Sequence, residues 1–391
     1  MQQIARPIKQ KARDCQPYRT GGQIAGGGPV SPIAGLRRAE VRHKHGVVTR
    51  TVAAEPLICN IPVIPGWHER APGVAVDRRA DIEIALIGVQ RPEVVERLTQ
   101  RFTLHHVYAD PDPLAALKKL GPRIRGAAGH GMAGLTRAHM ELMPKLEICA
   151  LNGVGLETSD VATARQRGIV IAIAPVLYDD VADLAIGLAL AACRRVAEGD
   201  RFVRAGRWSA GRLPLGRKLT GMRAGIIGLG RIGIEVARRL EAFRCDIGYV
   251  DPVPREVAYR AYPDAVALAS GSDILFLCAA GAPKGTGRPI VDQAIIEALG
   301  PRGIFVNVSR GWLVDEPALT EALATGRLGA AGLDVFYDEP NVPARLAALD
   351  NVVLTPHVAS STEETAKAMG DCVVDNLVSW FEGRGALTPV T

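Results

Sequence analysis

Three ionisable side chains follow apolar segments late in the chain, and their types suit acid–base chemistry at a carbonyl group. They are Arg310, Glu339 and His357. A histidine can protonate an oxygen, a neighbouring carboxylate can keep it protonated near neutral pH, and a guanidinium can bind a carboxylate and a carbonyl. His357 is the only histidine after His139, so no other imidazole can serve this part of the chain. Taken singly, these residues also fit a loop histidine and a structural Arg310–Glu339 ion pair.

A glycine-rich turn with the spacing G-x-G-x-x-G lies upstream of these residues. Gly228 permits a tight turn after a strand, Gly230 lets a pyrophosphate approach the backbone, and Gly233 lets the following helix pack closely. Arg231 and Ile232, at the start of that helix, complete this part of the predicted cofactor-binding set. An apolar segment before the turn and a helical pattern after it favour a nucleotide site over an ordinary glycine-rich turn.

The residue at the end of the next predicted strand bears on the choice of cofactor. Asp251 lies 18 residues after Gly233, where a carboxylate can accept hydrogen bonds from ribose hydroxyls. Its charge would repel the 2′-phosphate of NADP, so NAD(H) is favoured. Arg255 could reach such a phosphate if the turn after Asp251 folds back, and NADP(H) therefore stays open.

The elements that must position these residues alternate between short, β-branched apolar segments and helical patterns. This alternation predicts an α/β fold with parallel sheets covered on both faces. The expected strands are 82–87, 148–151, 169–173, 224–227, 247–250, 274–278, 304–308 and 352–354. Helices are expected at 92–100, at 179–197, and from a capping box at Ser361 and Glu364 toward Gly383. The last two helices are expected to connect domains.

The composition is that of an ordinary globular protein, with 391 residues of which 48% are hydrophobic and 23% charged. Seven cysteines are scattered without a C-x-x-C pair, which predicts reduced thiols in the cytoplasm and neither a disulfide framework nor a metal site. The longest apolar run, near 184–193, is about ten residues and too short for a membrane span.

Residues 1–80 differ from the rest of the chain in charge and pattern. They carry 13 Lys and Arg against 5 Asp and Glu, so the net charge of +6 arises there and the remainder is slightly acidic. Glycine clusters and scattered prolines without a helical or strand period predict a disordered basic extension. The body is therefore not expected to bind nucleic acid. The Arg-rich, acid-poor composition also leaves an organelle transit peptide as an alternative.

Together, the motifs between about Asp81 and Val390 resemble the D-isomer-specific 2-hydroxyacid dehydrogenase family. The matching segments are NGVGLETSDV at 152–161, the turn at 228–233, VNVSRGWLVDE at 306–316, GAAGLDVFYDEP at 329–340 and LTPH at 354–357. Residues 200–208 and the insertion at 341–343 look most like the glyoxylate/hydroxypyruvate reductase group. The strand end at Asp251 and the loop at 278–281 depart from that group's pattern.

The resemblance implies an oxidoreductase that moves hydride between NAD or NADP and a CH–OH group of a small 2-hydroxy or 2-keto acid. Arg310 would anchor the substrate, His357 would be the general acid/base, and Glu339 its partner. Asp334 would lie near the nicotinamide carboxamide, in a cofactor-binding set that also includes Cys278 and Val308.

A glycine loop completes the implied site. Backbone amides of Gly129, His130 and Gly131 would bind the substrate carboxylate, with the His130 side chain more incidental than catalytic.

The resemblance also implies two Rossmann-like domains, each a doubly wound parallel sheet. A flavodoxin-like substrate domain would be discontinuous, at 81–178 and 361–391, and an NAD(P)-binding domain would span 179–360 and form a homodimer. Alternatives on the same scaffold are a 3-phosphoglycerate or phosphite dehydrogenase. From another class, a corepressor-like binding protein would use the same nucleotide fold as a sensor.

Overall fold

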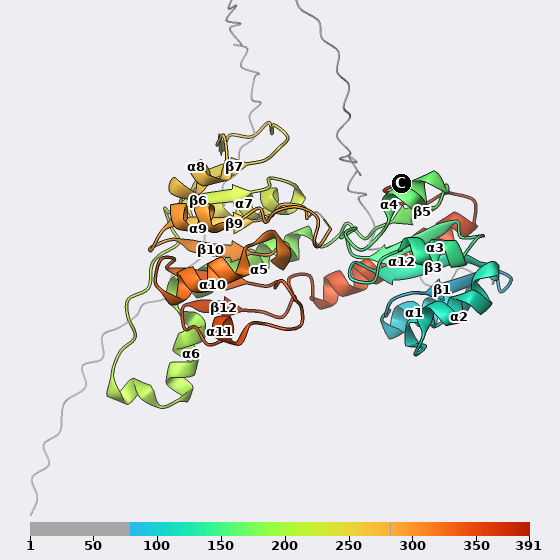
Figure 1. Cartoon of the computed structure of the whole chain (residues 1–391), viewed down its shortest axis with the longest axis horizontal. Helices are drawn as coiled ribbons and strands as arrows, with labels where there is room; N and C mark the ends of the chain where they lie inside the picture. Colours follow the sequence, from blue (N-terminus) through green and yellow to red (C-terminus); the bar gives the residue numbers. More distant parts are fainter. Residues whose placement is uncertain (1–78, 282) are drawn as a thin grey trace, which may run out of the picture. The chain divides into compact units, whose positions relative to one another are not determined.

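Two parallel β-sheets, each covered by helices on both faces, make up the part of the chain that the structure describes. A computed structural model describes residues 79–281 and 283–391 (Figure 1). The disordered extension predicted for residues 1–80 lies, apart from its last two residues, outside the described residues. Every strand pairing within the two sheets is parallel, and the predicted fold class is confirmed.

The first sheet has five strands in the order β2-β1-β3-β4-β5. This order is that of flavodoxin-like folds. Its strands are β1 (Glu83–Leu86), β2 (Thr103–His105), β3 (Ile124–His130), β4 (Ile148–Asn152) and β5 (Val170–Ala172). One face packs against α2 (Pro113–Leu120), α3 (Arg137–Leu142) and α4 (Val161–Gln166), and the other against α1 (Pro92–Thr99) and α12 (Glu363–Phe381). Short 3-10 turns lie at Val107–Ala109 and Gly121–Arg123.

The end of the chain returns to this first sheet. In α12, Val373, Leu377 and Phe381 are buried in one cluster with residues of β1. Beyond the helix, the amide of Val390 donates to the carbonyl of Ile171 at 2.8 Å. Segments nearly 300 residues apart in sequence thus share one core, as a discontinuous outer domain requires. The domain boundaries at 178 and 361 stay a prediction.

The second sheet has seven strands in the order β12-β11-β10-β9-β6-β7-β8. They are β6 (Arg223–Ile227), β7 (Asp246–Val250), β8 (Arg260–Ala261), β9 (Ile274–Leu277), β10 (Ile304–Asn307), β11 (Ala330–Leu333) and β12 (Val352–Leu354). The direction of winding reverses between β6 and β9, and in such sheets ligands bind beyond the carboxyl ends of the strands at this point.

Within the described residues, nine helical segments accompany the second sheet. They are α5 (Tyr178–Arg194), α6 (Val196–Arg204), α7 (Arg231–Ala242), α8 (Ala265–Ser270), α9 (Gln293–Leu299), α10 (Glu316–Ala324) and α11 (Ala344–Ala347), with 3-10 turns at Arg207–Ala210 and Gly311–Leu313. Among the described residues, no helix is both long enough and apolar enough to cross a membrane.

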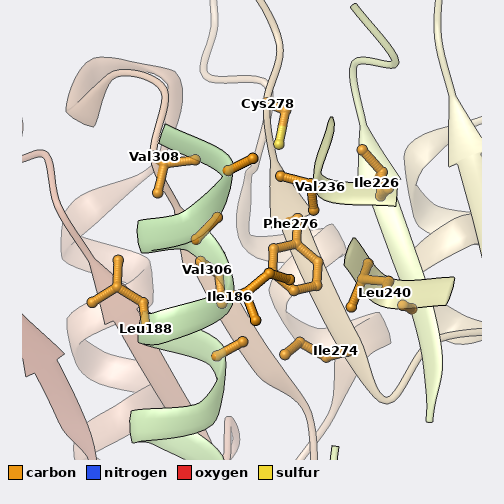
Figure 2. Packing of buried hydrophobic residues seen from close by; sticks show 14 of the residues in the cluster. Ile186, Leu188, Ile226, Val236, Leu240, Ile274, Phe276, Cys278, Val306 and Val308 are labelled. Atoms are coloured by element: carbon orange, nitrogen blue, oxygen red, sulfur yellow. The ribbon is translucent and has the colours of Figure 1, made fainter. Parts of the chain in front are cut away.

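The core of the second sheet explains why its strands are apolar on both faces. Ile274 and Phe276 of β9 face one cluster with α5 and α7, while their neighbours Leu275 and Leu277 face the opposite cluster with α8, α9 and α10. Figure 2 shows Phe276 in the middle of the first cluster, with Ile186 of α5 on one side and Leu240 of α7 on the other. Side chains that alternate between two buried faces leave no polar position in the strand.

The structure corrects several predicted boundaries. The helix expected at 179–197 ends at Arg194, because Arg195 adopts a left-handed conformation (φ 55°) before α6 begins. The last helix is capped by Thr362, whose side chain accepts from the amide of Thr365, and not by Ser361. Strands β2, β3, β8 and β11 were not predicted. Of these, β3 and β11 are rich in glycine and alanine, which have low strand propensity, and β2 and β8 are short edge strands.

Candidate active site

The glycine-rich turn after β6 has the geometry of a phosphate cradle. Gly228 has φ +88°, and a Cβ there would lie 2.5 Å from Cα of Ala279. A Cβ on Gly233 would lie 2.2 Å from the carbonyl oxygen of Gly228, so α7 packs directly on the turn. Around Gly230, by contrast, nothing lies within 4 Å of where a Cβ would stand, and no side chain caps α7. An open, uncapped helix N-terminus suits an anion, so the turn fits the pyrophosphate of a dinucleotide.

The carboxylate of Asp251 at the end of β7 is largely buried, with 5% of its side chain exposed. It accepts from the amides of Leu229 at 2.8 Å and Val253 at 2.9 Å. Arg255 does fold back, as its position allowed, but its Nη2 lies 3.2 Å from Oδ1 of Asp251. Asp251 thus already has protein donors, and ribose hydroxyls would have to share or replace the Arg255 contact.

His357 lies in the turn that follows β12 and has an unusual backbone conformation. Its φ is 53°, in the left-handed region that residues other than glycine adopt uncommonly. The amide of His357 donates to the carbonyls of Asp334 at 2.8 Å and Thr355 at 3.0 Å. These two bonds hold the strained residue in place.

The side chain of Asp334 organises the same turn. It is fully buried, and its Oδ1 accepts from Oγ1 of Thr355 at 2.6 Å and from the amide of Val358 at 2.9 Å. Its Oδ2 accepts from the amide of Ala359 at 3.0 Å. Asp334 was predicted only as a cofactor-binding residue, and sequence reasoning missed this role in holding the turn that carries His357.

His357 and Glu339 form a hydrogen-bonded pair. Nδ1 of His357 lies 2.7 Å from Oε2 of Glu339, and Oε1 of Glu339 accepts from the amide of Phe336 at 3.0 Å. Burial acts to raise the pKa of Glu339, but the hydrogen bonds from His357 and Phe336 and the charge of Arg310 hold this pKa below its ordinary value. Since Nδ1 is engaged, Nε2 is the imidazole nitrogen left for a substrate.

Arg310 follows β10 in a turn that Asn307 organises. The side chain of Asn307 accepts from the amide of Ser309 at 3.0 Å and donates to the carbonyl of Arg310 at 3.1 Å. The guanidinium of Arg310 pairs with Glu157, with Nε 3.2 Å from Oε1 and Nη2 3.3 Å from Oε2. The structural Arg310–Glu339 ion pair considered from the sequence is not the arrangement seen: Arg310 pairs with Glu157, and Glu339 pairs with His357. Glu157 lies in a motif used for the resemblance, but no role was predicted for it.

The predicted substrate loop is only partly a loop. Gly129 and His130 are the last residues of β3, paired with Leu151 and Asn152 of β4, and the chain leaves the sheet only at Gly131. Nδ1 of His130 accepts from the amide of Met132 at 3.3 Å, and burial lowers the pKa of His130. This imidazole is thus an acceptor that favours its neutral form.

Several of the residues predicted for cofactor binding, substrate binding or catalysis line one cavity of about 790 Å³. The predicted residues in its wall are Ile232, Val308, Arg310, Asp334, Glu339, His357, His130 and Gly131. Those predicted residues that do not line it are Gly129, Gly228, Gly230, Arg231, Gly233, Asp251 and Cys278. Cys278 is instead buried in the core beside β9, where burial raises the pKa of its thiol to about 12. Trp312 and Tyr337 line the cavity and were not predicted.

In the described part of the chain, no group of three or more His, Cys, Asp or Glu is placed to hold a metal ion.

Comparison with known proteins places this geometry in a family. Residues 186–359 match the model of the D-isomer specific 2-hydroxyacid dehydrogenase NAD-binding domain. A hydroxyphenylpyruvate reductase of Plectranthus scutellarioides is 46% identical over 297 residues, which cover 75% of this chain and 94% of that protein.

Two solved structures are also similar. A 2-hydroxyacid dehydrogenase of Ketogulonicigenium vulgare Y25 is 44% identical with a TM-score of 0.75, covering 80% of this chain and 99% of that one. An NADPH-dependent glyoxylate/hydroxypyruvate reductase of Sinorhizobium meliloti, in complex with NADP and malonate, is 40% identical with a TM-score of 0.71, covering 79% and 96%. The resemblance predicted from the motifs is confirmed, and the chain belongs to the D-isomer specific 2-hydroxyacid dehydrogenase family of NAD(P)-dependent oxidoreductases.

Proposed function

We propose that the chain is a reductase of small 2-keto acids in which Arg310 anchors the substrate and His357, paired with Glu339, is the general acid/base. The observation that carries the proposal is the 2.7 Å His357–Glu339 contact in the wall of the same cavity as Arg310. One cavity thus offers a proton donor and a cation, the two groups that reduction of a keto acid requires.

The mechanism follows from what these side chains can do. The nicotinamide, when bound, supplies the hydride that adds to the carbonyl carbon. Arg310 binds the substrate's carboxylate and carbonyl oxygen and stabilises the negative charge that develops on that oxygen. His357 donates its Nε2 proton to the oxygen, which becomes the hydroxyl, and Glu339 stabilises the imidazolium through Nδ1. Exchange with solvent then restores the proton on His357.

The choice of substrate and cofactor has separate support. The relatives named for hydroxyphenylpyruvate and glyoxylate/hydroxypyruvate favour a small 2-keto acid, bound at its carboxylate by Gly131 and neighbouring amides. Asp251 favours NAD(H), because a carboxylate at the end of the second strand of the nucleotide fold would repel a 2′-phosphate. NADP(H) stays open, since Arg255 lies beside Asp251 and the Sinorhizobium meliloti structure contains NADP.

We also propose the domain division predicted from the sequence, with the substrate domain at 81–178 and 361–391 and the NAD(P)-binding domain at 179–360. The two separate sheets and the return of α12 to the first sheet support it.

A cytoplasmic location agrees with the five cysteines of the described residues, which are all free thiols: Cys149, Cys193, Cys245, Cys278 and Cys372.

Replacing His357 with Ala is expected to lower turnover at least roughly a hundredfold, because the variant has no group to protonate the carbonyl oxygen. The affinity for NADH should stay within about twofold, since the pyrophosphate is expected to bind at the glycine turn and the adenosine ribose at Asp251, not at His357. Steady-state kinetics and a fluorescence titration of NADH measure both quantities.

A matched control is available in the first sheet. His105 forms a similar pair with Glu83, at 2.6 Å, and lies outside the cavity wall. The His105→Ala variant should keep wild-type turnover. Unchanged turnover in His357→Ala would contradict the assignment of the general acid.

Replacing Glu339 with Gln should move the upper limb of the kcat/KM profile for reduction to lower pH, because the variant lacks the negative charge that stabilises the imidazolium of His357. The pKa of Glu339 lies below its ordinary value, so the wild-type carboxylate is ionised throughout the neutral range in which this limb is measured. A Glu83→Gln control should leave the profile in place. If Glu339→Gln has the wild-type profile, Glu339 has only a structural role.

The homodimer implied by the resemblance would use the surface of α6 and the segment after it. Four large apolar side chains there are exposed: Val196 by 55%, Val203 by 55%, Trp208 by 70% and Leu215 by 97%. Figure 1 shows α6 reaching away from the strands of its own sheet. Contiguous exposed apolar side chains mark interaction surfaces, and these four come from one short stretch of the chain.

Light scattering should therefore give a mass of about twice the 41.6 kDa of the chain. Leu215→Glu should shift that mass toward the monomer, whereas the same change at the exposed Leu114 of α2 should not. A wild-type monomer would contradict the proposal.

A further inference from the structure

The carboxylate of Glu157 meets the guanidinium of Arg310 in a two-pronged contact. Nε of Arg310 lies 3.2 Å from one carboxylate oxygen, and Nη2 lies 3.3 Å from the other. Parallel contacts of this kind fix the plane of a guanidinium as well as its position. Only 12% of the Glu157 side chain and 24% of the Arg310 side chain are exposed, so the pair differs from the loose ion pairs of a protein surface.

Two glycines, which have no side chain, lie close against this pair. A Cβ on Gly155 would stand 2.5 Å from Nη2 of Arg310 and 2.6 Å from Oε2 of Glu157. A Cβ on Gly281 would stand 3.3 Å from Cγ of Arg310 and 3.3 Å from Oε1 of Glu157. The chain thus approaches the pair closely from two loops, and any side chain at position 155 would push the two groups apart.

The contact leaves Arg310 with a defined set of remaining donors. Nη1 donates to the carbonyl of Ser309 at 2.8 Å, while Nε and Nη2 each donate to Glu157. A guanidinium has five N–H bonds, so one remains on each terminal nitrogen. Those two are the donors that can reach a ligand in the cavity that Arg310 and Glu157 both line.

We propose that Glu157 is the positioning residue for Arg310: it holds the guanidinium so that one N–H of each terminal nitrogen faces the keto acid. The inference rests on the proposed function, in which Arg310 anchors the substrate. Glu157 itself does not touch the reacting atoms. Its effect is to set the orientation of Arg310 before the substrate arrives, so that little reorganisation is needed when charge develops on the carbonyl oxygen.

The first test compares Glu157→Gln with the wild type in steady-state reduction of hydroxypyruvate and glyoxylate. Gln keeps the size of the side chain but has a single acceptor oxygen and no charge, so it cannot hold both Nε and Nη2, and any contact that remains is weaker. We expect kcat to fall at least roughly tenfold and KM to rise, with the Kd of NADH unchanged within about twofold. A KM below that of the wild type would overturn the proposal, because it would mean that Glu157 competes with the substrate for Arg310. Unchanged kcat and KM would overturn it as well.

Two further variants separate positioning from a loss of folding. Gly155→Ala keeps both charges but places a methyl group within 2.5 Å of Arg310, and it should change kcat and KM in the same direction as Glu157→Gln. Glu147→Gln is the control, since Glu147 precedes the same strand β4 and pairs with Arg125 at 2.5 Å outside the cavity wall. Its kcat and KM should equal those of the wild type.

The last measurement does not depend on turnover. The Nε proton of Arg310, identified by its loss in Arg310→Lys, should exchange slowly with solvent in an NMR correlation spectrum of the cofactor-free protein. In Glu157→Gln the same proton should exchange rapidly. Equal exchange in both proteins would overturn the proposal about Glu157. If the wild type reduces no keto acid, the proposed function fails, and this spectrum still decides whether Glu157 holds Arg310.

Discussion

The buried carboxylate of Asp334 is the interaction on which the arrangement of the His357–Glu339 pair depends. A fully buried charge is costly unless its oxygens are satisfied, and three donors from the turn after β12 satisfy it. The carboxylate therefore fixes the path of residues 355–359, and the backbone of Asp334 accepts from the amide of His357. Asp334 directly follows β11, and the turn that carries His357 directly follows β12. The pairing of these two strands therefore sets the position of the imidazole.

Two pairs of side chains, each with one carboxylate, lie around the proposed substrate position. Glu339 lies against His357, and Glu157 lies against Arg310. Each group that would contact the substrate thus has a carboxylate behind it, which fixes its orientation while one side stays open to the cavity. If Arg310 had paired with Glu339 instead, neither charge would be free to act on a substrate or on His357, and His357 would lack its carboxylate partner. The observed pairing leaves both His357 and Arg310 available for the roles proposed for them.

Features carried by local pattern could be predicted from the sequence. The strand at 352–354 and the turn at 228–233 lie where expected, because β-branched runs and glycine spacing are local signals. Strand β3 was missed because its residues IRGAAGH have low strand propensity; glycine is needed at position 126, where a Cβ would lie 2.4 Å from Ile84. Tertiary packing, which a single sequence does not display, decided that strand.

The partners of charged residues were likewise beyond local pattern. Glu157 lies 153 positions before Arg310, and nothing in the spacing of either residue links them. The same holds for Asp251, whose protein donors include an amide from the turn after a different strand. Such contacts are set by how the sheets and loops meet, so the sequence could indicate which residues carry chemistry but not which of them hold the others in place.

Whether the chain reduces 2-keto acids is measured by following oxidation of NADH and NADPH with the purified full chain. The acids to compare are glyoxylate, hydroxypyruvate, pyruvate, phenylpyruvate and 2-ketogluconate, each with both cofactors. We expect the cofactor to be oxidised only when a keto acid is present. The product should be the D-2-hydroxy acid where it is chiral, and NADH should be used in preference to NADPH. Binding of NADH without its oxidation by any of the five acids would contradict a keto-acid reductase and favour a nucleotide-sensing protein.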